Sequence, residues 1–163
     1  MSDDHVAVQN VVSRFFLAMD RFEWQEIASL IDDEISLVAG QYVAGSRDAK
    51  PRDQFMAELV ERNGGFSLPE SGSFHGDFGH VVTIDGDTAH VQAHFYGSHW
   101  VGAGAEDEFH SLGMYEIDLT RRPMGWRIRQ LEITSLRNDG ASPAAIMEAA
   151  LESWKASGRP LSD

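Results

Sequence analysis

The sequence has 163 residues, and its 13 lysines and arginines against 26 aspartates and glutamates give a formal net charge of −13 with histidine neutral. We expect residues 1–163 to form one domain with a buried core. The acidic balance argues against nucleic acids and anionic membranes as partners, because both favour clustered basic side chains. The absence of cysteine excludes disulfides, thiolate nucleophiles and cysteine-bound metals.

The N-terminal segment predicts no export signal. Residues 1–5 are acidic where a secretory signal needs basic residues, and no apolar run approaches the roughly 18 residues of a membrane span. We therefore expect a cytoplasmic protein.

Apolar spacing predicts two consecutive helices. The first carries one apolar stripe over about three turns: Val8, Val11, Val12, Phe15, Phe16 and Met19. Asp20 and Glu23 have the spacing of a capping box for a second helix. Its apolar residues are Trp24, Ile27, Leu30 and Ile31. The acidic pair 32–33 is expected to end it.

A short strand is expected over residues 35–39, because apolar and polar residues alternate there. A third helix follows Asp48, with Pro51 in its first turn and the residues 63–65, Asn-Gly-Gly, at its end. A loop is then expected through Gly72.

From His75 onward the apolar period changes from that of a helix to that of a strand. A hairpin turn is predicted at residues 85–87, and the clearest alternation covers residues 88–100. Two further strands are expected over residues 112–121 and 126–136. The second half is therefore predicted to be an antiparallel meander.

Ser142 and Pro143 form a good start for a last helix, over about residues 143–157, which Gly158 ends. Helices segregated on one face of an antiparallel sheet define the α+β class rather than a doubly wound fold. The sequence has no dinucleotide fingerprint, P-loop or nucleophile elbow, which argues against nucleotide-binding proteins and α/β-hydrolases.

Five features occur in an order and spacing that point to a known family: residues 19–24, His75, residues 84–89, Tyr115 and residues 125–128. Over about residues 5–137 the chain resembles the SnoaL-like branch of the nuclear transport factor 2-like superfamily, which includes polyketide cyclases, scytalone dehydratase, bile-acid dehydratase and ketosteroid isomerase. The resemblance implies a cone-shaped α+β barrel, in which a curved antiparallel sheet wraps around the N-terminal helices. It also implies a pocket for a small apolar ligand.

The resemblance assigns roles to individual residues. Asp20 matches an aspartate that pairs with a histidine on the first long strand, and His75 is the nearest match to that histidine. His80 is its rival, because the match to His75 needs a one-residue adjustment in the glycine-rich stretch that follows. His99 matches a second histidine, and Tyr115 is expected to face the pocket.

Other candidates for substrate contact are aromatic: Phe16, Trp24, Tyr42 and Phe95. The chain departs from scytalone dehydratase at the positions of its two substrate-binding tyrosines, where it has Met19 and Ala39, although Tyr42 could reach the pocket if the strand is displaced. This departure leaves open which reaction of the family the chain would perform.

Two candidates also have ordinary structural explanations. Asp20 lies about 100° from the centre of the helix stripe, so it could cap the second helix in solvent or face the pocket. His99 continues the apolar face of its strand, where a histidine must be satisfied either by a core partner or by a ligand.

No metal or cofactor is expected. His90 and His94 lie on the opposite face of their strand, at a helix or subunit contact, and about 13 Å apart, which is too far to share one metal. The large side chains on that outer face, His94, Tyr96 and Trp100, predict a homodimer or higher homo-oligomer formed through it.

The leading functional hypothesis is a cofactor-independent acid/base enzyme of the dehydratase, isomerase or cyclase type, acting on a small apolar cyclic carbonyl or hydroxy compound. The alternative is a non-catalytic binding or assembly module on the same fold. An epoxide hydrolase would need acidic groups inside the pocket. Glu116 and Asp118 alternate with Tyr115 and are expected to face outward, which argues against it.

Overall fold

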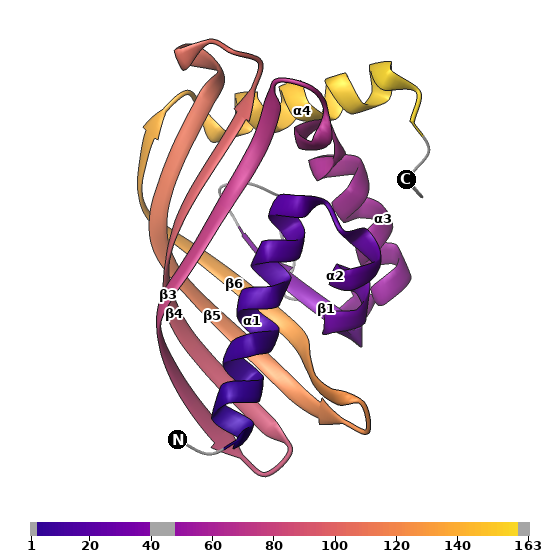
Figure 1. The fold of residues 1–163 in the computed structure, drawn as a ribbon, viewed down its shortest axis with the longest axis vertical. Coiled ribbons are helices and arrows are strands. Elements are labelled where there is room, and N and C mark those ends of the chain that lie inside the picture. The colour runs from indigo at the N-terminus through magenta and orange to yellow at the C-terminus, as the bar shows by residue number, and fades with distance from the viewer. Residues whose placement is uncertain (1–2, 40–47, 160–163) are drawn as a thin grey trace.

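The computed structural model describes residues 3–39 and 48–159, in which helices pack against a curved six-stranded sheet (Figure 1). The helices are α1 (Asp3–Arg21), α2 (Trp24–Leu30), α3 (Arg52–Asn63) and α4 (Pro143–Ser157), with short 3₁₀ helices η1 (Gly64–Ser67) and η2 (Ala105–Asp107). The strands are β1 (Ile31–Val38), β2 (Lys50–Pro51), β3 (Ser71–Asp85), β4 (Thr88–Val101), β5 (Glu108–Arg122) and β6 (Gly125–Gly140).

The sheet has the strand order β2-β1-β6-β5-β4-β3. Strands β3 to β6 form the predicted antiparallel meander, and the α+β class is confirmed. The sheet is mixed rather than wholly antiparallel, because β1 pairs with β6 in parallel. The long connection between β1 and β6 supplies the crossover that a parallel pair needs. The sheet is curved, but its edge strands β2 and β3 do not pair with each other. It is therefore not closed into a barrel.

Helix α1 lies along the concave face of the sheet (Figure 1). All six residues of its predicted apolar stripe are buried. The helix begins five residues before this stripe, at Asp3, where acidic side chains favour the positive end of the helix dipole. Asp4 accepts two hydrogen bonds of 2.8 Å from the guanidinium of Arg121 on β5, which ties the start of α1 to the sheet.

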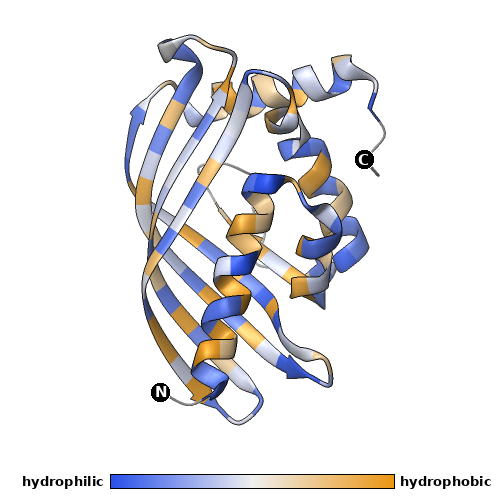
Figure 2. Ribbon diagram, in the orientation of Figure 1, coloured by the Kyte–Doolittle hydropathy of each residue, from blue (hydrophilic) through white to orange (hydrophobic). Residues whose placement is uncertain are grey.

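The sheet shows the predicted alternation of buried and exposed residues. Figure 2 shows apolar and polar residues following one another along the strands. On β4, Ala89, Val91, Ala93 and Phe95 are buried, and on β5, Tyr115, Ile117 and Leu119 are buried. These side chains form one core with α1 and α2. Glu116 and Asp118 point away from this core, as expected.

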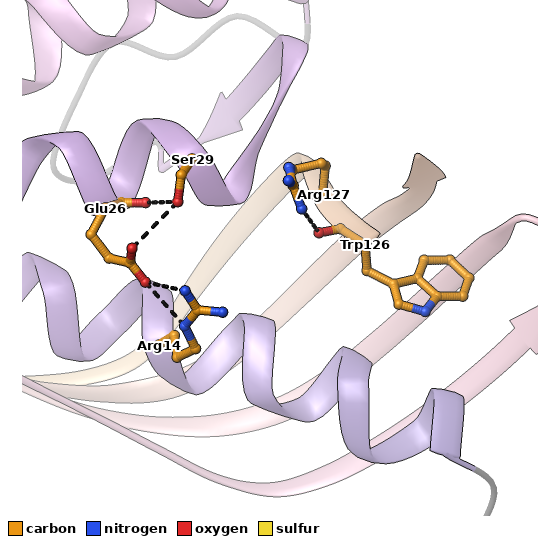
Figure 3. Close-up of polar contacts among 5 residues, drawn as sticks. All are labelled: Arg14, Glu26, Ser29, Trp126 and Arg127. Atoms are coloured by element: carbon orange, nitrogen blue, oxygen red, sulfur yellow. Dashed lines mark hydrogen bonds and ion pairs between the residues drawn. The ribbon is translucent and has the colours of Figure 1, made fainter. Parts of the chain in front are cut away.

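A polar contact also connects α1 to α2 (Figure 3). The Nε atom of Arg14 donates to Glu26 at 3.0 Å, and the hydroxyl of Ser29 donates to the carbonyl oxygen of Glu26 at 2.7 Å. Such exposed ion pairs contribute about 0–1 kcal/mol to stability. The burial of Ile27 and Leu30 therefore does more than this contact to hold α2 against the core.

The boundary between α2 and β1 differs from the prediction. Ile31 and the acidic pair that follows it belong to β1, whereas the prediction placed the end of a helix there. Asp32 is buried in the strand because Arg122 neutralises it, donating two hydrogen bonds of 2.8 and 2.7 Å. The predicted capping box is also wrong, since Glu23 occupies the N-cap position of α2 without a side-chain capping bond.

Helix α4 crosses one end of the sheet and packs on η1, with the predicted bounds (Figure 1). A Cβ atom at Gly65 would lie 1.9 Å from the carbonyl oxygen of Ala150 on α4. We expect Gly65→Ala to lower the free energy of unfolding by about 1–3 kcal/mol, because the backbone of α4 must move. Gly76→Ala is the control, since its nearest contact is a movable ring at 3.3 Å. Equal melting temperatures of the two variants would contradict this packing.

Candidate active site

A largely apolar cavity of about 100 Å³ lies between α1, α3 and the sheet. This volume is of the same order as that of an engineered apolar cavity of about 150 Å³ that binds benzene. Six residues of its lining have polar side chains: Arg62, Asn63, His75, His99, Ser111 and Tyr115. The arrangement, an apolar cavity with a few polar groups, is typical of a site for a small organic molecule.

Asp20 and His75 form a pair beside this cavity. The Nδ1 atom of His75 lies 2.6 Å from Oδ1 of Asp20, and the backbone N–H of His75 donates to Oδ2 at 2.9 Å. The hydroxyl of Ser73 donates to Oδ1 at 3.3 Å. Only 13% of the His75 side chain and 17% of the Asp20 side chain are exposed, so solvent competes little for these bonds. Asp20 lies in the last turn of α1 and bonds to β3 rather than capping α2.

These contacts set the proton positions on His75. A carboxylate oxygen only accepts hydrogen bonds, so Nδ1 of His75 carries a proton and donates it to Asp20. In the neutral ring the other nitrogen, Nε2, is then unprotonated and can accept a proton. His75 lines the cavity, where a bound molecule could supply that proton.

His80 is held elsewhere. Its Nε2 atom lies 2.8 Å from Oδ2 of Asp77, and the hydroxyl of Ser13 donates to the same oxygen at 2.8 Å. The pairing register of β3 with β4 shifts between Phe78 and Val81, which accounts for the extra residue in this stretch. Of the two alternatives that the sequence leaves open, the structure therefore pairs His75 with Asp20.

His99 lies next to His75, with their ring centroids 4.8 Å apart and the rings nearly perpendicular. It stacks on Phe109 and meets the edge of Phe66. Its buried Nδ1 atom has no hydrogen-bond partner among the residues that the structure describes. Burial first, and the neighbouring His75 second, hold the pKa of His99 well below its usual value of 6.5, which keeps the ring neutral.

The lowered pKa of His99 predicts a loss of stability in acid. As the pH falls through 6.5, the unfolded chain takes up a proton at this residue that the folded chain refuses. We expect the free energy of unfolding of the native chain to fall relative to that of His99→Phe by up to about 1.4 kcal/mol per pH unit. Urea unfolding of both proteins at pH 7.5 and 5.5 measures this difference. Parallel pH dependences would contradict it.

The aromatic candidates separate into two groups. Phe16, Phe95 and Tyr115 line the cavity, and Tyr115 is stacked between the other two rings at centroid distances of 4.4 and 4.6 Å. Trp24 is not part of the cavity lining; it packs beside Phe22 on the core at the start of α2. The helical spacing of Trp24 fits a residue that lines the cavity as well as one that packs on the core, so the sequence could not distinguish the two.

The positions where the chain departs from scytalone dehydratase also lie in this region. Met19 and Ala39 both line the cavity, so apolar side chains occupy it where the resemblance leads one to expect tyrosines. Tyr42 lies outside the described residues.

Sequence reasoning missed Arg62, which lines the cavity from the last turn of α3. A signal for it was present. Phe55, Leu59 and Arg62 follow one another at intervals of four and three residues, which places the arginine on the buried face of the helix.

No helix in residues 3–39 and 48–159 is both long and apolar enough to cross a membrane. Within the same residues, histidine, aspartate and glutamate side chains form no group of three that could hold a metal ion.

The fold is that of an α+β protein of the nuclear transport factor 2-like type. The chain belongs to the SnoaL-like domain family, whose model matches residues 1–132. No curated protein matches the chain.

Solved structures show the same fold. The Kfla4162 protein from Kribbella flavida is 23% identical, with a TM-score of 0.78 over 89% of this chain and 97% of that one. A proposed scytalone dehydratase from Novosphingobium aromaticivorans is 16% identical, with a TM-score of 0.68 over 85% of this chain and 91% of that one. LinA is 11% identical, with a TM-score of 0.68 over 83% of this chain and 88% of that one.

Proposed function

We propose that this protein is an acid/base enzyme that needs no cofactor. Its substrate is a small, largely apolar cyclic carbonyl or hydroxy compound, and its reaction is a dehydration, isomerisation or cyclisation that begins with abstraction of a proton next to a carbonyl group. The observation that carries the proposal is the Asp20–His75 pair, in which Nδ1 faces the carboxylate while the His75 ring lines the apolar cavity. The similarity of fold to a proposed scytalone dehydratase supports the same class of reaction.

Each polar group then has a distinct role. His75 removes the proton through Nε2, while Asp20 orients the ring and stabilises the positive charge that the ring acquires. His99 stays neutral and, with Tyr115, donates a hydrogen bond to the oxygen on which negative charge develops. Neutral donors suit this role because the apolar surroundings strengthen their hydrogen bonds to an anionic oxygen.

Deuterium incorporation tests this class of chemistry without the natural substrate. Cyclopentanone, cyclohexanone and indanone are incubated with the protein in D₂O, and exchange of the protons next to the carbonyl is followed by NMR. We expect exchange of at least one ketone to be faster than with an equal concentration of free imidazole. Binding of a ketone without faster exchange would instead identify a non-catalytic binding module.

We also propose a homodimer or higher homo-oligomer that forms through the outer face of the sheet. Large apolar side chains are exposed there, including Phe74, Phe78, Tyr96 and Leu112. Tyr96 and Leu112 are cross-strand partners, and the ring of Phe74 lies 6.4 Å from that of Tyr96, so the exposed residues form a continuous patch. Sedimentation at micromolar concentration is expected to show a species larger than 18.1 kDa. A single species of that mass would contradict the proposal.

A further inference from the structure

Arg62 is the charged residue that α3 contributes to the cavity wall. It projects from the last turn of α3, on the face that also carries Phe55 and Leu59, and all three residues line the cavity. The two histidines reach the cavity from the sheet, on β3 and β4. The cavity therefore has an arginine on its helical side and two histidine rings on its sheet side.

The guanidinium of Arg62 has no acidic partner within the described part of the chain. The acidic residue whose charge affects the pKa of Arg62 is Glu58, one turn earlier. Its carboxylate already binds Lys50 at 2.5 Å and Gln54 at 3.0 Å. Arg62 is partly buried in the cavity wall, and this burial lowers the pKa of its guanidinium despite the opposing effect of Glu58. The other arginine that lies on α3, Arg52, is not part of the cavity lining, and its guanidinium lies 3.5 Å from the carboxylate of Asp33.

A desolvated cation without a counterion costs free energy, and a bound anion would recover that cost. Arginine matches a carboxylate well, because its planar group can donate two parallel hydrogen bonds. The net charge of −13 makes the missing partner notable, since acidic side chains outnumber basic ones two to one.

We propose that the cavity binds a small cyclic compound that carries one carboxylate, and that Arg62 holds this carboxylate. The inference rests on the proposed function and names its substrate class: a cyclic keto or hydroxy acid rather than a neutral ketone. Arg62 fixes the acid end on the helical side, and the ring of the ligand extends among Phe16, Phe95 and the other apolar side chains toward His75. Arg62 is thus a specificity-determining residue.

Isothermal titration calorimetry with two ligands of the same shape tests the proposal. Benzoate carries the negative charge, and benzamide is its neutral counterpart. We expect the native chain to bind benzoate at least about tenfold more tightly than benzamide. Arg62→Gln should remove this preference. Arg52→Gln makes the same change of charge on the same helix outside the cavity and should retain it.

Two further variants make the outcome specific. Arg62→Lys keeps the charge and should keep part of the preference, which provides a result even if the glutamine variant does not fold. His80→Ala should keep the preference, because His80 bonds to Asp77 and is not part of the cavity lining. Equal binding of benzoate and benzamide to the native chain, no binding of benzoate at millimolar concentration, or a preference that survives in Arg62→Gln would each overturn the inference. None of these outcomes depends on proton exchange, so failure of the anion site is distinguishable from failure of the proposed catalysis.

Discussion

Replacing His75 with alanine is expected to reduce the rate of α-proton exchange about 100-fold or more. A positioned general base contributes typically 10²–10⁴-fold, and the substitution removes the ring that contacts Asp20 at 2.6 Å. The backbone N–H of His75 would still donate to Asp20, so much of the local structure should survive. Exchange in D₂O measures the effect, with thermal melting as the check on folding.

His80→Ala is the matched control for this experiment. His80 lies on the same strand as His75, also pairs with an aspartate, and has the same exposed side-chain fraction, 13%. Its partner is Asp77, however, and it is not part of the cavity lining. Its removal should leave the exchange rate almost unchanged. In His75→Ala, added imidazole should restore part of the activity, because the substitution opens a space beside the cavity. A folded His75→Ala variant with the native rate would show that another group is the base.

Asp20→Asn is expected to have the second largest effect. We expect the rate of α-proton exchange in D₂O to fall about 100-fold or more, with little change in ligand affinity. The oxygen of the asparagine can still accept the bond from the backbone N–H of His75, while its NH₂ group faces Nδ1. An NH₂ group only donates, so Nδ1 must become the acceptor and the proton moves to Nε2. The ring then presents a proton to the ligand where a base is needed, and this wrong tautomer is costly in other enzymes that use a histidine base.

The corresponding control is Asp77→Asn, which changes the same functional group in the pair that does not face the cavity. It should leave turnover near the native value. If Asp20→Asn retained native turnover, Asp20 would be a structural link between α1 and β3 rather than an orienting group.

Much of the fold was predictable because its elements are long and strongly periodic. The stripe on α1 and the alternation on β4 each repeat often enough to identify the element and its buried face. The parallel pairing of β1 with β6 was not predictable in the same way, since both parallel and antiparallel partners bury the same alternate residues. The boundary at Ile31 depended on a partner for Asp32 that lies 90 residues away, at Arg122.

The residue types of the candidate site were predictable, and the resemblance favoured His75 as the partner of Asp20 while leaving His80 as a rival. Asp20 has a position that suits helix capping as well as a place beside the cavity, and only the contact between α1 and β3 shows that it bonds to His75. The choice between His75 and His80 depended on the register shift in β3, which a short glycine-rich stretch does not reveal. His99 was identifiable because a polar residue continues an apolar strand face, and its buried, unpartnered Nδ1 atom explains why that pattern was informative.

The central claim is that Asp20 fixes the proton of His75 on Nδ1 and leaves Nε2 as the base. NMR of the protein with ¹⁵N-labelled histidine, at a pH where the ring is neutral, measures this directly through the nitrogen chemical shifts of His75. We predict the shift of a protonated nitrogen at Nδ1 and that of an unprotonated nitrogen at Nε2, with the two exchanged in Asp20→Asn. A native chain in which Nε2 carries the proton would contradict the account.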